Sequence, residues 1–132
     1  MGVAVTKPSI EYVFPSNVNL GIVAMKLRGK LATDDASRSI VRMQEAISRA
    51  GRLRIYFDIS EYSGFELGAV WEKLKAAAST FSALERVAVL GDQRWAEWWS
   101  RLADPITPFV IRHFPVERAE DAVRWISEGL EG

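Results

Sequence analysis

Short apolar runs alternate along this chain with longer segments whose apolar residues recur every three or four positions. Short apolar runs are typical of strands, and the longer spacing is typical of amphipathic helices. The pattern predicts five strands, at Ser9–Phe14, Leu20–Leu27, Leu53–Ile59, Arg86–Leu90 and Phe109–Phe114. Because the turn-forming residues Pro15-Ser16-Asn17 separate the first two strands, we expect those two to form an antiparallel pair.

Four helices are expected between and after these strands. In chain order they begin at Thr33 or Asp34, at Ser63, at Gln93 and after Pro115. The start at Ser63 is the clearest, since Ser63 and Glu66 have the spacing of a capping box. The strand Arg86–Leu90 is short, continuous and rich in β-branched residues, which indicates a central, parallel strand. The order β-β-α-β-α-β-α-β-α predicts an α/β fold in which a mixed five-stranded sheet packs with about four helices.

Length, charge and composition exclude several classes of protein. The chain has 132 residues, 48% of them hydrophobic, and we expect a single domain over residues 1–132. The formal net charge is zero, which argues against nucleic-acid binding, because such binding requires a basic field. There is no cysteine and only one histidine, so we expect no metal and no cofactor. No apolar stretch is long enough to span a bilayer and the N-terminus does not resemble a signal peptide, which predicts a cytoplasmic protein.

Several short motifs, in order, resemble those of the SpoIIAA-like branch of the STAS fold, which is also described as CRAL-TRIO-like. The likeness runs from about Leu20 to Ile126 and covers most of the chain. The motifs are Gly29-Lys30-Leu31, Asp58, Tyr62-Ser63-Gly64-Phe65, Ala69–Lys75, Ala88–Asp92 with Trp95, and Phe114 with Ala122–Trp125.

This resemblance implies a small regulatory or ligand-binding domain without established catalysis. Members of the branch have been discussed as binding small apolar ligands or associating with membranes. In anti-sigma-factor antagonists, a serine that precedes a glycine at the start of the second helix is phosphorylated by a partner kinase. Ser63-Gly64 lies at the comparable place here, although the loop after Asp58 is shorter and the chain has no Asp-Ser-Ser-Gly string.

A polar rim is predicted where the third and fourth strands end. Ligands of open α/β sheets bind beyond the carboxyl ends of the parallel strands. The residues expected there are Asp58, Ser60, Glu61, Tyr62 and Ser63 after the third strand, and Gly91 and Asp92 after the fourth. They indicate either a polar or phosphorylated docking site, or simply a turn at Asp58 with helix caps at Ser63 and Asp92.

Aromatic residues are the strongest functional signal in the sequence. At helical spacing Trp95, Trp98, Trp99 and Leu102 share one face of a short segment. Phe65 and Trp71 belong to the preceding helix. Such a face can pack in the core, or it can contact a ligand, a membrane surface or a second subunit, since tryptophan is enriched at interfaces.

The first helix carries a charged face. Arg38, Arg42 and Arg49 share it with Glu45, at spacings of three and four residues. A stripe of this kind is usually a solvated face with pairs between successive turns, and the alternative is a surface for anionic lipid or an acidic partner.

Catalytic motifs are missing from the sequence. The single histidine, His113, stands on a predicted strand between Arg112 and Phe114, with neither a nucleophile nor a carboxylate adjacent to it. There is no Gly-rich phosphate loop and no Gly-x-Ser-x-Gly elbow. We therefore do not expect an enzyme.

Together these features predict a non-catalytic binding module for an apolar small molecule or lipid, with peripheral contact at the inner membrane surface. The alternative is a signalling interaction domain that resembles anti-sigma-factor antagonists and is switched by phosphorylation near Ser63. The zero net charge does little to oppose self-association, and so it is compatible with a homodimer.

Overall fold

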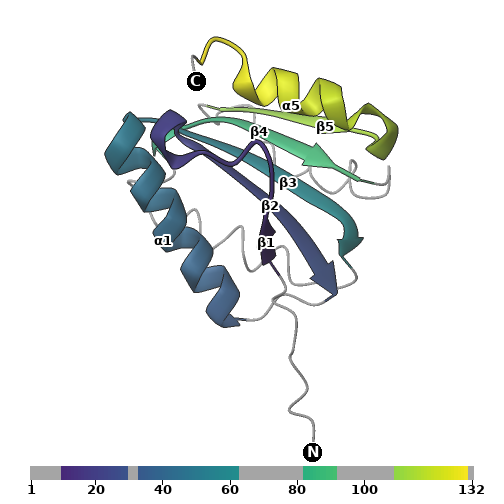
Figure 1. Ribbon diagram of the computed structural model, residues 1–132, viewed down its shortest axis with the longest axis horizontal. Coiled ribbons are helices and arrows are strands. Elements are labelled where there is room, and N and C mark those ends of the chain that lie inside the picture. Colours follow the sequence, from purple (N-terminus) through teal and green to yellow (C-terminus); the bar gives the residue numbers. More distant parts are fainter. Residues whose placement is uncertain (1–9, 30–32, 63–81, 92–108, 131–132) are drawn as a thin grey trace, which may run out of the picture.

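In the residues that the structure describes, five strands form one sheet in the order β1-β2-β3-β4-β5 (Figure 1). The structure is a computed structural model that describes residues 10–29, 33–62, 82–91 and 109–130. The strands span Ile10–Tyr12 (β1), Ile22–Gly29 (β2), Leu53–Tyr62 (β3), Leu84–Leu90 (β4) and Val110–Phe114 (β5). β1 is antiparallel to β2 and the other neighbouring pairs are parallel, which confirms the mixed sheet, the antiparallel first pair and the central place of β4.

Within the described residues, the α-helices α1 (Thr33–Ala50) and α5 (Ala119–Ser127) lie on opposite faces of this sheet (Figure 1). Alternate residues of each central strand point to opposite faces. Ile55 and Phe57 of β3 join a core cluster with Met43 of α1, whereas Tyr56 joins a second cluster with Ile126 of α5. About four helices were expected, and the described residues contain these two. The other two expected helices lie in 63–81 and 92–108, outside the described residues.

The second strand begins later than the hydrophobic run predicts. Val18–Leu20 forms a 3₁₀ helix (η1), which is capped by Asn17, and β2 starts at Ile22. Gly21 ends η1 with φ of 78°, and a Cβ on it would lie 2.6 Å from the carbonyl oxygen of Arg52. The apolar run therefore contains a turn that requires glycine, which hydrophobicity alone does not reveal.

The last helix also begins later than expected. Pro115 precedes a second 3₁₀ helix, η2 (Val116–Arg118), and α5 follows directly. Ala122 and Ile126 of the predicted apolar stripe are fully buried against the sheet. The expected stop of the first helix is confirmed: Gly51 has φ of 73°, and its N–H donates to the carbonyl of Ile47.

Two arginines from the sheet hold the end of α5. Arg54 Nη1 donates to the carbonyl oxygens of Ile126 at 3.2 Å and Glu128 at 2.7 Å. Arg86 Nη1 donates to the carbonyl oxygen of Trp125 at 2.7 Å. The last carbonyls of a helix have no partner within it and carry partial negative charge, so these guanidinium groups anchor α5 to β3 and β4.

Candidate functional site

The candidate site is at the carboxyl ends of the parallel strands. This side of the sheet is called the edge below. β3 was expected to end at Ile59, but it continues to Tyr62, so the prediction that Asp58, Ser60 and Tyr62 follow the strand is wrong. The strand continues because, after a register shift, Glu61 pairs with Arg28 and Tyr62 with Gly29 of β2. Backbone pairing with β2 therefore extends the strand through these polar residues, where their type had suggested a turn.

Asp58 and Ser60 lie together on β3. The Asp58 Oδ1 atom accepts hydrogen bonds from the Ser60 hydroxyl at 2.6 Å and from the Ser60 backbone N–H at 3.0 Å. The Tyr62 side chain, in contrast, is buried in the core cluster on the α1 side. Of the predicted rim, the structure thus places Asp58 and Ser60 side by side and turns Tyr62 inward.

The strands β3 and β4 are direct neighbours at this edge. Asp58 stands opposite Leu90, and Gly91 packs so closely on β3 that a Cβ on it would lie 2.8 Å from Ile59 Cγ1. The Gly91 N–H donates to the Phe114 carbonyl at 3.2 Å, so the ends of β4 and β5 meet at this glycine, beside Ile59 of β3. β3 continues past its last pair with β4, from Asp58 to Tyr62, before the chain leaves it.

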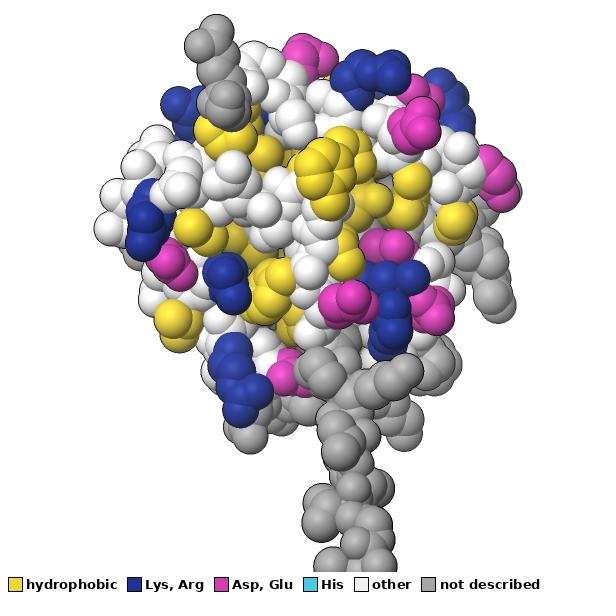
Figure 2. Space-filling model, in the orientation of Figure 1, with side chains coloured by type: hydrophobic (Ala, Val, Ile, Leu, Met, Phe, Trp, Pro, Cys, Tyr) yellow, Lys and Arg dark blue, Asp and Glu magenta, His cyan; other side chains and the backbone are white. Residues whose placement is uncertain are grey.

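A network of ion pairs crosses the first three strands near the same edge. Lys26 Nζ lies 2.6 Å from Glu61 Oε2, and Arg28 Nη2 lies 2.8 Å from Glu11 Oε2. Arg28 Nε lies 3.7 Å from Glu61 Oε2 and links the two pairs. Figure 2 shows side chains of both signs around a face with hydrophobic side chains at its middle. Sequence reasoning missed this network, because its members come from three strands and no spacing along the chain relates them.

Tyr56 lies on the face of β3 that is opposite α1, and its surroundings raise the pKa of its phenol. Tyr56 is 4% exposed and belongs to the core cluster on the α5 side. Burial, together with the negative charge of Asp58, raises the pKa of Tyr56 to about 12. The phenol therefore stays neutral across the physiological range.

The predicted aromatic contact residues fall in two segments of the sequence, 63–81 and 92–108. Phe65, Trp71, Trp95, Trp98, Trp99 and Leu102 lie outside the described residues, as do Ser63 and Asp92.

The charged face of α1 is mostly paired. Arg38 Nη1 lies 3.4 Å from Asp35, and Arg49 Nε lies 3.3 Å from Glu45. The Arg42 guanidinium lies 4.4 Å from the centre of the Tyr12 ring, a cation–π contact between α1 and β1. Burial raises the pKa of Tyr12, and the adjacent Arg42 partly offsets this.

His113 has a hydrogen-bonding role on β5. Its Nε2 lies 2.8 Å from the carbonyl oxygen of Gly91. A carbonyl only accepts, so Nε2 must carry the proton and donate. The histidine thereby ties β5 to the end of β4.

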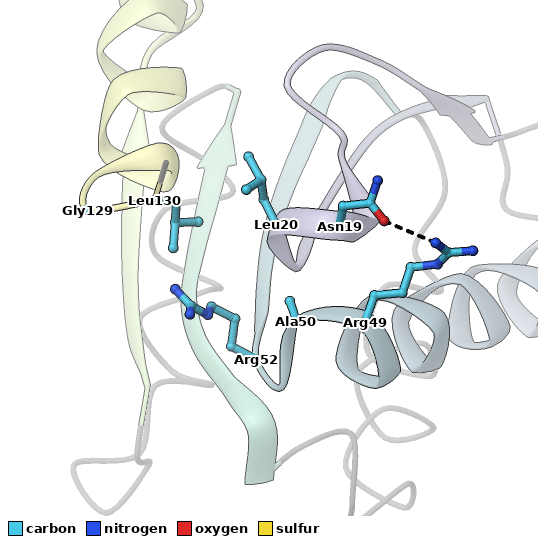
Figure 3. Close-up of a pocket in the computed structure, with 7 residues that line it drawn as sticks. All are labelled: Asn19, Leu20, Arg49, Ala50, Arg52, Gly129 and Leu130. Atoms are coloured by element: carbon cyan, nitrogen blue, oxygen red, sulfur yellow. Dashed lines mark hydrogen bonds between the residues drawn. The ribbon is translucent and has the colours of Figure 1, made fainter. Parts of the chain in front are cut away.

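A pocket of about 330 Å³ lies away from this edge, between η1, the end of α1 and the residues after α5 (Figure 3). Arg49 Nη1 donates to Asn19 Oδ1 at 3.1 Å on one side, and Arg52 extends toward Leu130 on the other. Sequence analysis did not identify this pocket, since three separate segments form it. Within the described part of the chain, no group of three or more histidine or acidic side chains has the arrangement of a metal site.

The fold is that of an α/β domain with a mixed sheet, and comparison identifies its family. The sequence profile of the SpoIIAA-like family matches residues 22–127, so the chain belongs to this family. The chain is also similar to an uncharacterized protein of the DUF3478 family with a SpoIIAA-like fold from Shewanella loihica PV-4, known from a crystal structure. The two share 26% identity and a TM-score of 0.67 over 95% of this chain and 99% of the other. No curated protein matches the chain.

The family indicates a regulatory or binding module, and neither the family's nor the neighbour's description includes a catalytic activity. Of the helices that the structure describes, neither has the length and apolar character needed to cross a membrane.

Proposed function

We propose that the protein is a non-catalytic binding module that takes up a small apolar ligand or attaches to a membrane surface. The observation that carries this proposal is that the neighbouring strands β3 and β4 are parallel and therefore run toward the same side of the sheet. The chain leaves these adjacent parallel strands at Tyr62 and at Leu90. Ligands of open α/β sheets bind beyond such an edge.

The two segments that follow this edge supply the aromatic residues. Residues 63–81 include Phe65 and Trp71, and residues 92–108 include Trp95, Trp98 and Trp99. Tryptophan combines a large apolar ring with an N–H group, which suits it to the boundary between an apolar phase and water. Full burial of such side chains contributes about 1.5–3 kcal/mol each, and an apolar ligand or membrane would supply this burial.

Tryptophan fluorescence tests the proposal. With phosphatidylcholine liposomes or dodecanol, the emission should shift to the blue, and the shift should be lost in the Trp98→Ala and Trp99→Ala variants. Trp125→Phe is the matched control for dodecanol, because Trp125 lies on α5 and should leave that shift in place. If lipid, dodecanol and protein concentration all leave the emission unchanged, the tryptophans pack only in the protein's own core.

The alternative function, a signalling interaction domain switched by phosphorylation near Ser63, is supported by membership of the SpoIIAA-like family. Mass spectrometry of protein purified from cells distinguishes it by detecting phosphate on Ser63. The capping-box spacing of Ser63 and Glu66 instead predicts a helix cap, and Ser63→Ala should then cost about 0.5–2 kcal/mol of stability.

A further inference from the structure

A groove of about 280 Å³ lies between β5 and α5, and basic side chains line it. Arg112 comes from β5, Arg118 from η2 and Arg124 from α5. Trp125 and Asp121 of α5 also line the groove. Arginines from three successive elements thus converge on one concave surface.

Within the described residues, the negative charge of the carboxylates in the groove does not neutralise the positive charge of these arginines. Asp121 serves two of them: its Oδ2 lies 2.8 Å from Arg118 Nε, and its Oδ1 lies 3.3 Å from Arg124 Nη1. Glu128, the other acidic residue of the groove, pairs with Arg86 at 3.6 Å. In the described part of the chain no carboxylate forms an ion pair with Arg112. The groove therefore carries a surplus of positive charge although the whole chain is neutral.

Aromatic rings hold Arg112 in place instead. Its guanidinium carbon lies 5.2 Å from the centre of the Phe114 ring and 5.3 Å from that of Trp125. Arg86 lies 5.1 Å from the same Trp125 ring and donates to the Trp125 carbonyl, which fixes the ring from β4. Contact with a ring face engages the flat side of a guanidinium and leaves its N–H groups at the rim for an acceptor.

We propose that this groove binds the phosphate group of a small phosphate ester or of a lipid headgroup. Arg112, Arg118 and Arg124 donate the hydrogen bonds to the phosphate oxygens. Planar guanidinium groups donate paired hydrogen bonds that match phosphate oxygens. In the free protein Asp121 occupies Arg118 and Arg124, so an incoming phosphate competes with this carboxylate. The site is independent of the aromatic segments proposed above to bind an apolar ligand, since the two share no residue.

Titration of the full chain with inorganic phosphate, followed by ¹H–¹⁵N NMR at constant ionic strength, tests the proposal. Shifts should concentrate on β5, η2 and α5, including the indole N–H of Trp125, which Trp125→Phe identifies. Arg112→Gln should weaken binding about tenfold or more, since it removes a hydrogen bond between two charged groups. Arg38→Gln is the control, because Arg38 is an exposed arginine on α1, across the sheet, paired with Asp35.

A second variant changes affinity in the opposite direction. Asp121→Asn removes the competing carboxylate and should tighten phosphate binding several-fold. Equal effects of Arg112→Gln and Arg38→Gln, or weaker binding by Asp121→Asn, would overturn the proposal. So would shifts that sodium chloride reproduces at the same ionic strength, because these would reflect screening alone.

Vesicles identify the source of the phosphate group. Protein that sediments with phosphatidic acid vesicles, but not after Arg112→Gln, indicates a lipid headgroup. Binding of free phosphate without sedimentation indicates a soluble phosphate ester. Failure of this proposal is distinguishable from failure of the apolar-ligand proposal, since the latter is tested with uncharged dodecanol and with Trp98 and Trp99 variants.

Discussion

Replacement of Arg54 by methionine should cost the protein about 2–4 kcal/mol of its stability, because Arg54 anchors the end of α5. The residue is 8% exposed, and its guanidinium forms three hydrogen bonds. Nε donates to Glu85 at 3.0 Å, and Nη1 donates to the carbonyl oxygens of Ile126 and Glu128. Methionine matches the unbranched stem of arginine as far as the position of Nε, so the change keeps the packing of the stem and removes the donors.

The magnitude comes from the groups that the substitution leaves behind. A buried acceptor without a partner costs about 1–3 kcal/mol, and the bond to the Ile126 carbonyl is the buried one. The bond to Glu128, partly buried, adds about 1 kcal/mol. The side chain of Glu85 is 46% exposed, so it regains water and adds little. The total therefore falls at or below the 3–5 kcal/mol typical of breaking a fully buried ion pair.

Urea denaturation of the full chain measures this loss, and Arg38→Met is the matched control. Arg38 is 75% exposed and pairs with Asp35 within one helix, so its loss should cost less than about 0.5 kcal/mol. Hydrogen exchange should show faster opening of α5 amides in Arg54→Met, with α1 unchanged. If the two variants lose the same stability, or if α5 exchanges as in the parent protein, the anchoring argument is wrong.

Two further predictions concern a turn and a titration. Gly21→Ala should destabilise the protein by about 1–3 kcal/mol more than Gly51→Ala in thermal or urea unfolding. Both glycines have positive φ, but only at Gly21 would a Cβ meet the Arg52 carbonyl oxygen, and equal losses would contradict this. The pKa of Tyr56, raised to about 12, predicts stability that is fully present below pH 10 and falls as pH rises toward 12, because the unfolded chain ionises first. Tyr56→Phe should remove this part of the alkaline loss, and absorbance at alkaline pH should show one late-titrating tyrosine fewer after the substitution than in the parent protein.

The sequence alone determined the number of strands, the antiparallel first pair and the parallel direction of β4. Apolar runs revealed the inner strands β2, β3 and β4, because a strand buried on both faces needs apolar side chains at successive positions. The cluster Pro15-Ser16-Asn17 revealed the antiparallel first pair, and Gly51 marked the end of α1. These signals are local: each depends on residues within a few positions of one another.

Only the tertiary structure decided where β3 ends and which charges meet. β3 continues to Tyr62 because β2 pairs with it there, and the residues of β3 do not by themselves indicate which strand lies beside them. The ion pairs of Arg28, the anchoring bonds of Arg54 and the groove around Arg112 all join residues that the fold brings together from separate elements. Arginine in a sequence indicates an exposed charge, and its partner depends on the side chains that packing places within its reach.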